Sequence, residues 1–264
     1  MDLELNDKVA LVTGASKGIG KAVALGLATE GARVAVVARD AAMLDKVAAE
    51  CRDRSGRDAV AAAADLSRLD EVERVVGEVK ARLRRIDVLV NNAGAIRGGA
   101  FTAIPDAQWI EDWNLKLLGY IRMCRAVFPL MQAQGGGRIC NVVGAAARNP
   151  TAAYLTGGAA NAALVNFTKG LADLGSPSKI LVTAVSPAAT KTERWDALIA
   201  QQAAASGRTA QELQAEAEAP YKLGRIATSE DIADMVCFLV SARASFVTGI
   251  CITVDGGATR GVYP

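Results

Sequence analysis

Three glycines follow at short intervals after an apolar segment near the start of the chain. Gly14, Gly18 and Gly20 come directly after the apolar run 9–13 and lead into the helix-forming segment 21–27. Glycine lets the backbone turn tightly and approach a pyrophosphate, and the N–H groups at a helix start attract its charge. The loop, which also holds Ser16, Lys17 and Ile19, therefore predicts a dinucleotide-binding site. A plain turn between strand and helix is the alternative.

The residue that follows the second apolar run indicates which dinucleotide binds. A carboxylate there would hold the 2′-hydroxyl of the NAD ribose, but this chain carries Arg39. A guanidinium can pair with a 2′-phosphate in bidentate geometry, and Lys17 adds a second cation. NADP is therefore favoured as the cofactor over NAD. The simpler interpretation is that both residues are solvated surface cations.

The residue types that are missing limit the chemistry further. The chain contains no histidine, which excludes Ser-His-Asp and Cys-His nucleophiles and most catalytic zinc sites. Its five cysteines are scattered without the spacing of a metal or redox site, so we expect no metal and buried, reduced thiols. Any acid or base must be a tyrosine, lysine, aspartate, glutamate or cysteine.

The elements that position these residues alternate regularly along the chain. Short, continuously apolar runs predict seven strands at 9–13, 34–37, 59–64, 88–91, 139–143, 180–185 and 250–254. Segments of helical period lie between them at 18–30, 41–53, 68–84, 107–133, 153–174 and 229–242. This alternation predicts a single Rossmann-type domain over 1–264, an α/β fold in which helices cover both faces of a doubly wound parallel sheet. Residues 193–220 fall outside the alternation and predict a helical flap over the substrate.

Composition narrows the partners and the compartment. The 264 residues carry 30 Lys and Arg against 28 Asp and Glu, and no stretch concentrates basic residues, so we expect no nucleic acid partner. The acidic start and the lack of an apolar run of about 18 residues favour neither export nor a membrane span. We expect a cytoplasmic protein.

Four further segments make the chain resemble the classical short-chain dehydrogenase/reductase family over essentially its whole length. They are Asp65-Leu66, Asn91-Asn92-Ala93-Gly94, Ser186-Pro187 and Asp255-Gly256-Gly257. The resemblance implies that Asp65 and Leu66 lie near the adenine, that Asn92, Ala93 and Gly94 shape the cofactor groove, and that Pro187, Ala188, Thr190 and Thr192 lie by the nicotinamide. Tyr154 would also border the cofactor.

The chemistry of that family rests on an Asn-Ser-Tyr-Lys set, from which this chain departs. The resemblance implies that Tyr154 exchanges a proton with the carbonyl or alcohol while hydride moves to or from the nicotinamide. The lysine that would lower the pKa of this tyrosine is replaced by Gly158, and the serine that would bind the substrate oxygen is replaced by Gly144.

The asparagine position of the set falls on a lysine. Without gaps, the family's long helix aligns with residues 107–133 so that Lys116 takes the place of the asparagine. A two-residue insertion would restore Asn114, but it would rotate every later side chain by about 200°. We therefore name Lys116 as a catalytic candidate whose ammonium substitutes for the missing lysine. In the alternative interpretation it points to solvent.

These observations predict an NADPH-preferring oxidoreductase that interconverts a carbonyl and an alcohol on a small-molecule substrate, with Tyr154 as general acid/base. The alternative is a dinucleotide-binding sensor or scaffold that has lost catalysis. Arg97 and Arg148 lie near the predicted pocket and could meet an acidic group of the substrate. The resemblance also implies a homo-oligomer, a dimer or tetramer, formed through the helices at 107–133 and 153–174.

Overall fold

The computed structural model describes residues 1–259, apart from the side chains of Arg194 and Ala205. Residues 260–264, the end of the predicted domain, lie outside this part. Seven parallel strands form one sheet in the order β3-β2-β1-β4-β5-β6-β9. Their bounds are β1 Val9–Thr13, β2 Arg33–Ala38, β3 Ala59–Ala63, β4 Val88–Asn91, β5 Gly137–Val142, β6 Ile180–Pro187 and β9 Cys251–Val254. The predicted doubly wound fold and its seven strands are confirmed.

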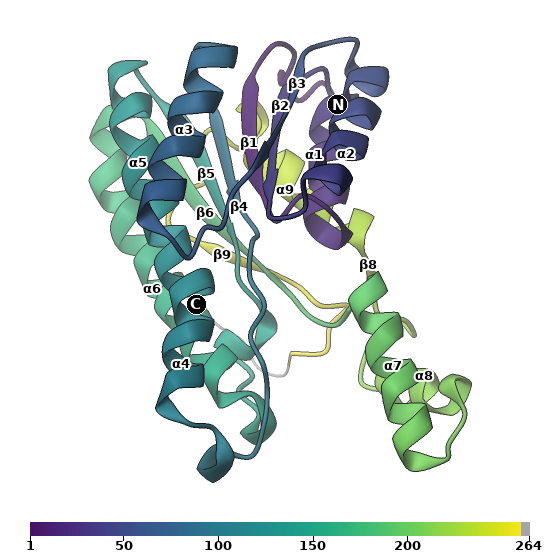
Figure 1. Ribbon diagram of the computed structural model, residues 1–264. Coiled ribbons are helices and arrows are strands. Elements are labelled where there is room, and N and C mark those ends of the chain that lie inside the picture. The colour runs from purple at the N-terminus through teal and green to yellow at the C-terminus, as the bar shows by residue number, and fades with distance from the viewer. Residues whose placement is uncertain (260–264) are drawn as a thin grey trace.

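Helices cover both faces of this sheet (Figure 1). The helices α1 Gly18–Thr29, α2 Ala41–Ser55 and α9 Ser229–Leu239 lie on one face, and α3 Leu69–Leu83, α5 Gly119–Ala133 and α6 Leu155–Gly175 lie on the other. Alternate residues of β1 enter different cores, since Ala10 and Val12 pack with α1 and α9 while Val9 and Leu11 pack with α3 and α5. Burial on both faces explains why the strands are continuously apolar.

The order of the strands reverses between β1 and β4, which are neighbours in the sheet. In open parallel sheets ligands bind in the crevice beyond the carboxyl ends of the strands at such a reversal. The glycine loop and the turn after β4 are therefore the two sides of the predicted cofactor crevice.

The segment predicted as one helix at 107–133 contains a break. It consists of α4 Asp106–Trp113, a π-helical turn at Asn114–Leu118, and α5. A π-helical turn holds an extra residue without ending the helix. The turn contains both Asn114 and Lys116, the two candidates for the asparagine position.

The predicted flap consists of two helices, α7 Glu193–Ser206 and α8 Ala210–Glu218. They project beyond the carboxyl end of the sheet at the lower right of Figure 1. A short parallel pair that the sequence analysis did not predict, β7 Thr190–Lys191 with β8 Ala227–Thr228, joins the two ends of this insertion. The base of the flap is therefore held by backbone hydrogen bonds close to β6.

Candidate functional site

The glycine loop turns sharply because two of its glycines have a left-handed backbone. The φ angles are +64° at Gly14 and +56° at Gly18, and a Cβ on Gly14 would lie 2.8 Å from the Cα of Ala93. Helix α1 starts at Gly18, and no side chain caps its first turn. The N–H groups and the positive end of this 12-residue helix therefore face the edge of the sheet, an arrangement that fits a pyrophosphate.

Thr13 ties the glycine loop to the turn after β4. Its buried hydroxyl accepts hydrogen bonds from the backbone N–H groups of Asn92 at 2.9 Å and Ala93 at 3.1 Å. The Asn92 side-chain amide donates to the carbonyl oxygens of Thr13 and Gly14, both at 3.2 Å. The two sides of the crevice are thus a single hydrogen-bonded unit. Thr13 was not singled out from the sequence because a threonine that ends a buried strand gives no distinctive signal.

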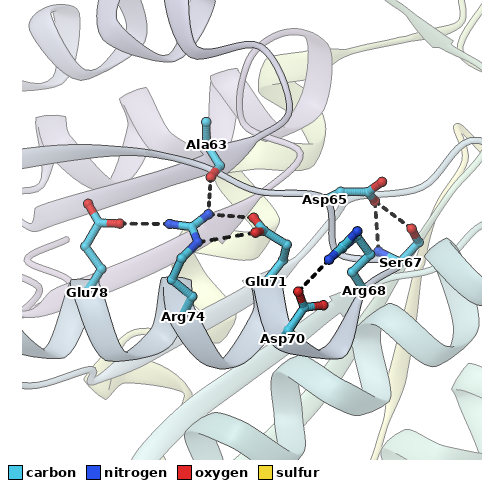
Figure 2. Close-up of polar contacts among 8 residues, drawn as sticks. All are labelled: Ala63, Asp65, Ser67, Arg68, Asp70, Glu71, Arg74 and Glu78. Atoms are coloured by element: carbon cyan, nitrogen blue, oxygen red, sulfur yellow. Dashed lines mark hydrogen bonds and ion pairs between the residues drawn. The ribbon is translucent and has the colours of Figure 1, made fainter.

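Asp65 follows β3 and accepts two hydrogen bonds from Ser67, one from its N–H at 3.0 Å and one from its hydroxyl at 2.7 Å (Figure 2). Burial raises the pKa of the Asp65 carboxyl, but the bonds from Ser67 and the charges of Arg39 and Arg68 outweigh it, so the pKa is lowered. Asp65 is therefore ionised at neutral pH. Arg39, which follows β2, lies close enough for its charge to act on this carboxylate. Leu66 beside Asp65 is buried.

The start of α3 is anchored below this turn by arginine contacts (Figure 2). Arg74 donates to the carbonyl oxygen of Ala63 at 2.6 Å and pairs with Glu71 and Glu78 on its own helix. Exposed ion pairs of this kind contribute little individually. The bond to Ala63 connects the helix to the end of β3 and so holds the turn that carries Asp65.

The predicted nicotinamide segment lies at the end of β6. The Ala188 N–H donates to the carbonyl of Val254 in β9, and the Thr190 hydroxyl donates to the carbonyl of Ala188. Thr192 caps α7, and its methyl group would lie 3.2 Å from a Cβ on Gly18. Residues far apart in sequence, Gly18 in the glycine loop and Thr192 at the base of the flap, therefore lie side by side.

Tyr154 lies at the junction of a 3₁₀ turn, Ala152–Tyr154, and α6. Its half-buried ring covers Gly157, where a Cβ would overlap the ring carbons, and a Cβ on Gly98 would lie 3.6 Å from its Cδ2. The phenol is held between the start of α6 and the loop after β4.

Lys116 reaches from the π-helical turn to the end of β5. Its ammonium donates to the carbonyl oxygens of Val142 at 3.0 Å and Val143 at 3.1 Å, and it lies 5.2 Å from the centre of the Tyr120 ring. The stem of Lys116 packs so closely on Gly94 that a side chain there would overlap it. The partly buried Lys116 side chain therefore does not run along the surface of its own helix. Its ammonium contacts Val143, the residue that precedes Gly144.

The buried Tyr120 hydroxyl donates to the same Val142 carbonyl at 2.8 Å. Burial raises the pKa of Tyr120 well above its usual range, and the nearby thiols and the Tyr154 phenol raise it further. Tyr120 therefore stays protonated. Its hydroxyl and the Lys116 ammonium share the Val142 carbonyl at the end of β5.

The two glycines at the positions of the missing serine and lysine have different surroundings. A Cβ on Gly158 would lie 3.3 Å from the carbonyl oxygen of Ala146. A Cβ on Gly144 would lie 2.8 Å from the side-chain nitrogen of Asn161. An asparagine that the sequence analysis did not select therefore points at the serine position.

Arg97 does not offer a free cation to a substrate. Its guanidinium pairs with Glu111 and with the buried Asp112, and its N–H also donates to Asp112. The carbonyl of Arg97 accepts from the Thr156 hydroxyl at the start of α6. Arg97 thus joins the loop after β4 to α4 and α6 through these bonds.

The profile of one protein family, described as short chain dehydrogenase, matches residues 8–203. The chain belongs to the short-chain dehydrogenase family.

Similar proteins include oxidoreductases that match this chain over nearly its full length. The 2,3-dihydro-2,3-dihydroxybenzoate dehydrogenase of Bacillus subtilis is 33% identical over 98% of this chain and 98% of its own. The solved structure of L-sorbose reductase from Gluconobacter frateurii with NADPH and L-sorbose has a TM-score of 0.96 at 30% identity and covers 99% of this chain and 100% of that one. Actinorhodin polyketide ketoreductase with NADPH has a TM-score of 0.90 at 31% identity, covering 96% and 97%.

The candidate residues of this short-chain dehydrogenase gather at one edge of the sheet. The glycine loop, Arg39, Asp65 and Leu66, the Asn92–Gly94 turn and the segment from Pro187 to Thr192 follow the ends of β1, β2, β3, β4 and β6. Among the described residues, no helix is long and apolar enough to cross a bilayer, and no group of three metal-ligating side chains occurs.

Proposed function

We propose that this short-chain dehydrogenase is an NADP-dependent oxidoreductase that interconverts a carbonyl and an alcohol, with Tyr154 as the general acid/base. The proposal rests on one observation above all. Tyr154 lies at the start of α6, which follows β5, and the Lys116 ammonium from the π-helical turn is held at the end of β5, although the family's serine and lysine are absent. The NADPH in the two structural neighbours supports the choice of cofactor class.

The cofactor would be held by groups along the carboxyl edge. The uncapped first turn of α1 would bind the pyrophosphate, and the exposed side chains of Arg39 and Lys17 would pair with the 2′-phosphate. Thr190 and Thr192, at the base of the flap, would border the nicotinamide. When bound, NADPH supplies the hydride for reduction of the substrate carbon.

Tyr154 supplies the proton. During reduction its hydroxyl donates to the substrate oxygen as negative charge develops there, and in the reverse direction the phenolate accepts that proton. The Lys116 ammonium takes over the electrostatic task of the missing lysine, since a nearby positive charge favours the phenolate. Its bonds to the carbonyls of Val142, the last residue of β5, and Val143 hold it at the strand end.

The proposal is tested with purified protein, NADPH and a panel of ketones, aldehydes and ketoses that includes L-sorbose, with NADPH oxidation followed spectroscopically. We expect turnover of at least one carbonyl, and we expect Tyr154→Phe to lower kcat about 100-fold or more while the Kd for NADPH changes less than about threefold. NADPH binding without turnover of any substrate, in either direction, would instead identify a sensor or scaffold.

A further inference from the structure

Asn161 is a buried amide whose polar atoms are not fully satisfied. Its exposed fraction is 3%, and its Oδ1 is buried without a hydrogen-bond partner among the described residues. Burying an unsatisfied amide oxygen destabilises a fold. An apolar side chain of similar size would suit a helix packed on a sheet better. The asparagine therefore calls for a reason other than stability.

Its place on α6 directs the amide toward the site. Tyr154 directly precedes the first residue of α6, and its ring lies over Gly157, which is one helical turn before Asn161 on the same face. Helical side chains lean toward the N-terminus of their helix. On this face Gly157 and Gly158 carry no side chain to stand between Asn161 and Tyr154.

A side chain at position 144 would displace the amide of Asn161. The 2.8 Å between the Asn161 nitrogen and a Cβ on Gly144 is shorter than contacts that real Cβ atoms make, so the end of the Asn161 side chain would have to shift. The serine of the family and the asparagine of this chain thus compete for the same space. Glycine at 144 leaves the amide in its present place.

We propose that Asn161 is a positioning residue that replaces the missing serine: its amide holds a water molecule beside Gly144, and this water donates a hydrogen bond to the substrate oxygen. The inference rests on the proposed function. The chemistry fits because the buried Asn161 Oδ1, which lacks a partner among the described residues, accepts one O–H of the water and leaves the other O–H to donate to the substrate oxygen. Tyr154 then transfers the proton while the water holds the substrate oxygen in place.

The first test compares Asn161→Leu, which keeps the size of the side chain and removes its polarity, with Asn6→Leu, at an exposed asparagine before β1 and thus at the other end of the sheet. With a carbonyl from the panel we expect Asn161→Leu to lower kcat/KM about 10- to 100-fold, with unchanged NADPH affinity and an unchanged or higher Tm. For Asn6→Leu we expect kcat/KM to stay within about twofold. If Asn161→Leu lowers Tm and keeps kcat/KM, the residue is structural and the proposal is wrong.

A transplant of the serine is the second test. Gly144→Ser alone should impair the enzyme, because its Cβ meets the amide of Asn161. In Gly144→Ser/Asn161→Ala that conflict is removed and a hydroxyl is restored, so we expect kcat/KM to recover about tenfold relative to Asn161→Ala. A double variant no more active than Asn161→Ala contradicts the exchange of roles.

A crystal structure of the protein with NADP⁺ provides a readout that needs no turnover. We expect an oxygen, from water or substrate, within hydrogen-bond distance of the Asn161 amide beside Gly144, and its loss in Asn161→Leu. If the panel shows no turnover but this oxygen is present, the proposed function fails while the placement of Asn161 stands. An amide satisfied by protein groups alone overturns the inference.

Discussion

At the scale of single residues, this site keeps a phenol and changes the groups around it. The Lys116 ammonium comes from a different helix than the family's lysine and is fixed by the carbonyl oxygens of Val142 and Val143. Hydrogen bonds to a charged group contribute about 1.5–3 kcal/mol each. The position of the charge is therefore defined, which the proposed electrostatic role of Lys116 requires.

Replacing Lys116 by methionine should slow the reaction. We expect Lys116→Met to lower kcat about tenfold or more near pH 7 and to move the pH of half-maximal activity upward, because the phenolate of Tyr154 loses its nearby positive charge. Lys169→Met is the control, since Lys169 lies exposed on α6 and pairs with Asp173. A pH–rate profile of Lys116→Met that matches the wild type would assign Lys116 a structural role only.

In our interpretation, Arg39 sets the preference for NADP over NAD. We expect Arg39→Gln to weaken NADPH binding about 10- to 100-fold and to leave NADH binding within about threefold, because the 2′-phosphate loses a charge-assisted pair. Titration calorimetry with both cofactors measures this. The control is Arg68→Gln, because Arg68 is an exposed arginine that also lies near the Asp65 carboxylate. This change should alter the binding of neither NADPH nor NADH. Equal losses for NADPH and NADH would show that Arg39 does not read the phosphate.

At the scale of elements, the start of α9 is stabilised by a capping box. Thr228 and Asp231 exchange side-chain to backbone hydrogen bonds, and Arg225 forms two bonds with the Asp231 carboxylate. The bonds from Arg225 and Thr228 lower the pKa of Asp231. Helix α9 packs on α1, which begins in the glycine loop. The cap therefore helps to hold α1 in place beside the predicted cofactor crevice.

The cap predicts a pH-dependent stability. Because the folded pKa of Asp231 is depressed, its contribution is complete above the unfolded pKa of about 3.9 and is lost as the pH falls through the folded value. We expect Asp231→Asn to lower the free energy of unfolding by about 1–2 kcal/mol at pH 7, and the difference to shrink as the pH drops below about 4. Urea unfolding over this range measures it, with the exposed Asp234→Asn as control. If the difference in the free energy of unfolding stays constant with pH, the effect does not come from the charge of Asp231.

At the scale of the whole molecule, α6 leaves a face of small residues uncovered. Ala159, Ala162, Ala163, Asn166 and Gly170 are exposed on it, and Leu174 at its end is 64% exposed. Small residues let two helices approach closely, as in the dimer or tetramer that the family resemblance implies.

A charge on this face should break the assembly. We expect the wild-type protein to be a dimer or tetramer by size-exclusion chromatography with light scattering, and Ala163→Glu to lower that mass with its circular dichroism retained. Ala215→Glu, on the exposed side of α8, is the matched control. A wild-type monomer, or an Ala163→Glu variant of unchanged mass, would contradict an interface through α6.

The sequence by itself determined the strands, the glycine loop and the identity of the short-chain dehydrogenase, because each depends on local properties. Continuous apolar runs require burial on both faces, and glycines with positive φ mark the loop next to a helix start. The residues predicted for the cofactor follow the ends of strands, and parallel strands bring those ends to one edge without further information.

Only the tertiary structure decided which side chains surround Gly144 and Gly158, where the family's serine and lysine are missing. The π-helical turn that carries Lys116 is an irregularity that no simple periodicity reveals, and the contact of Asn161 with position 144 joins residues from different elements. Such relations depend on the packing of α6 against the end of β5. Periodicity describes one element at a time, whereas packing depends on the side chains of two.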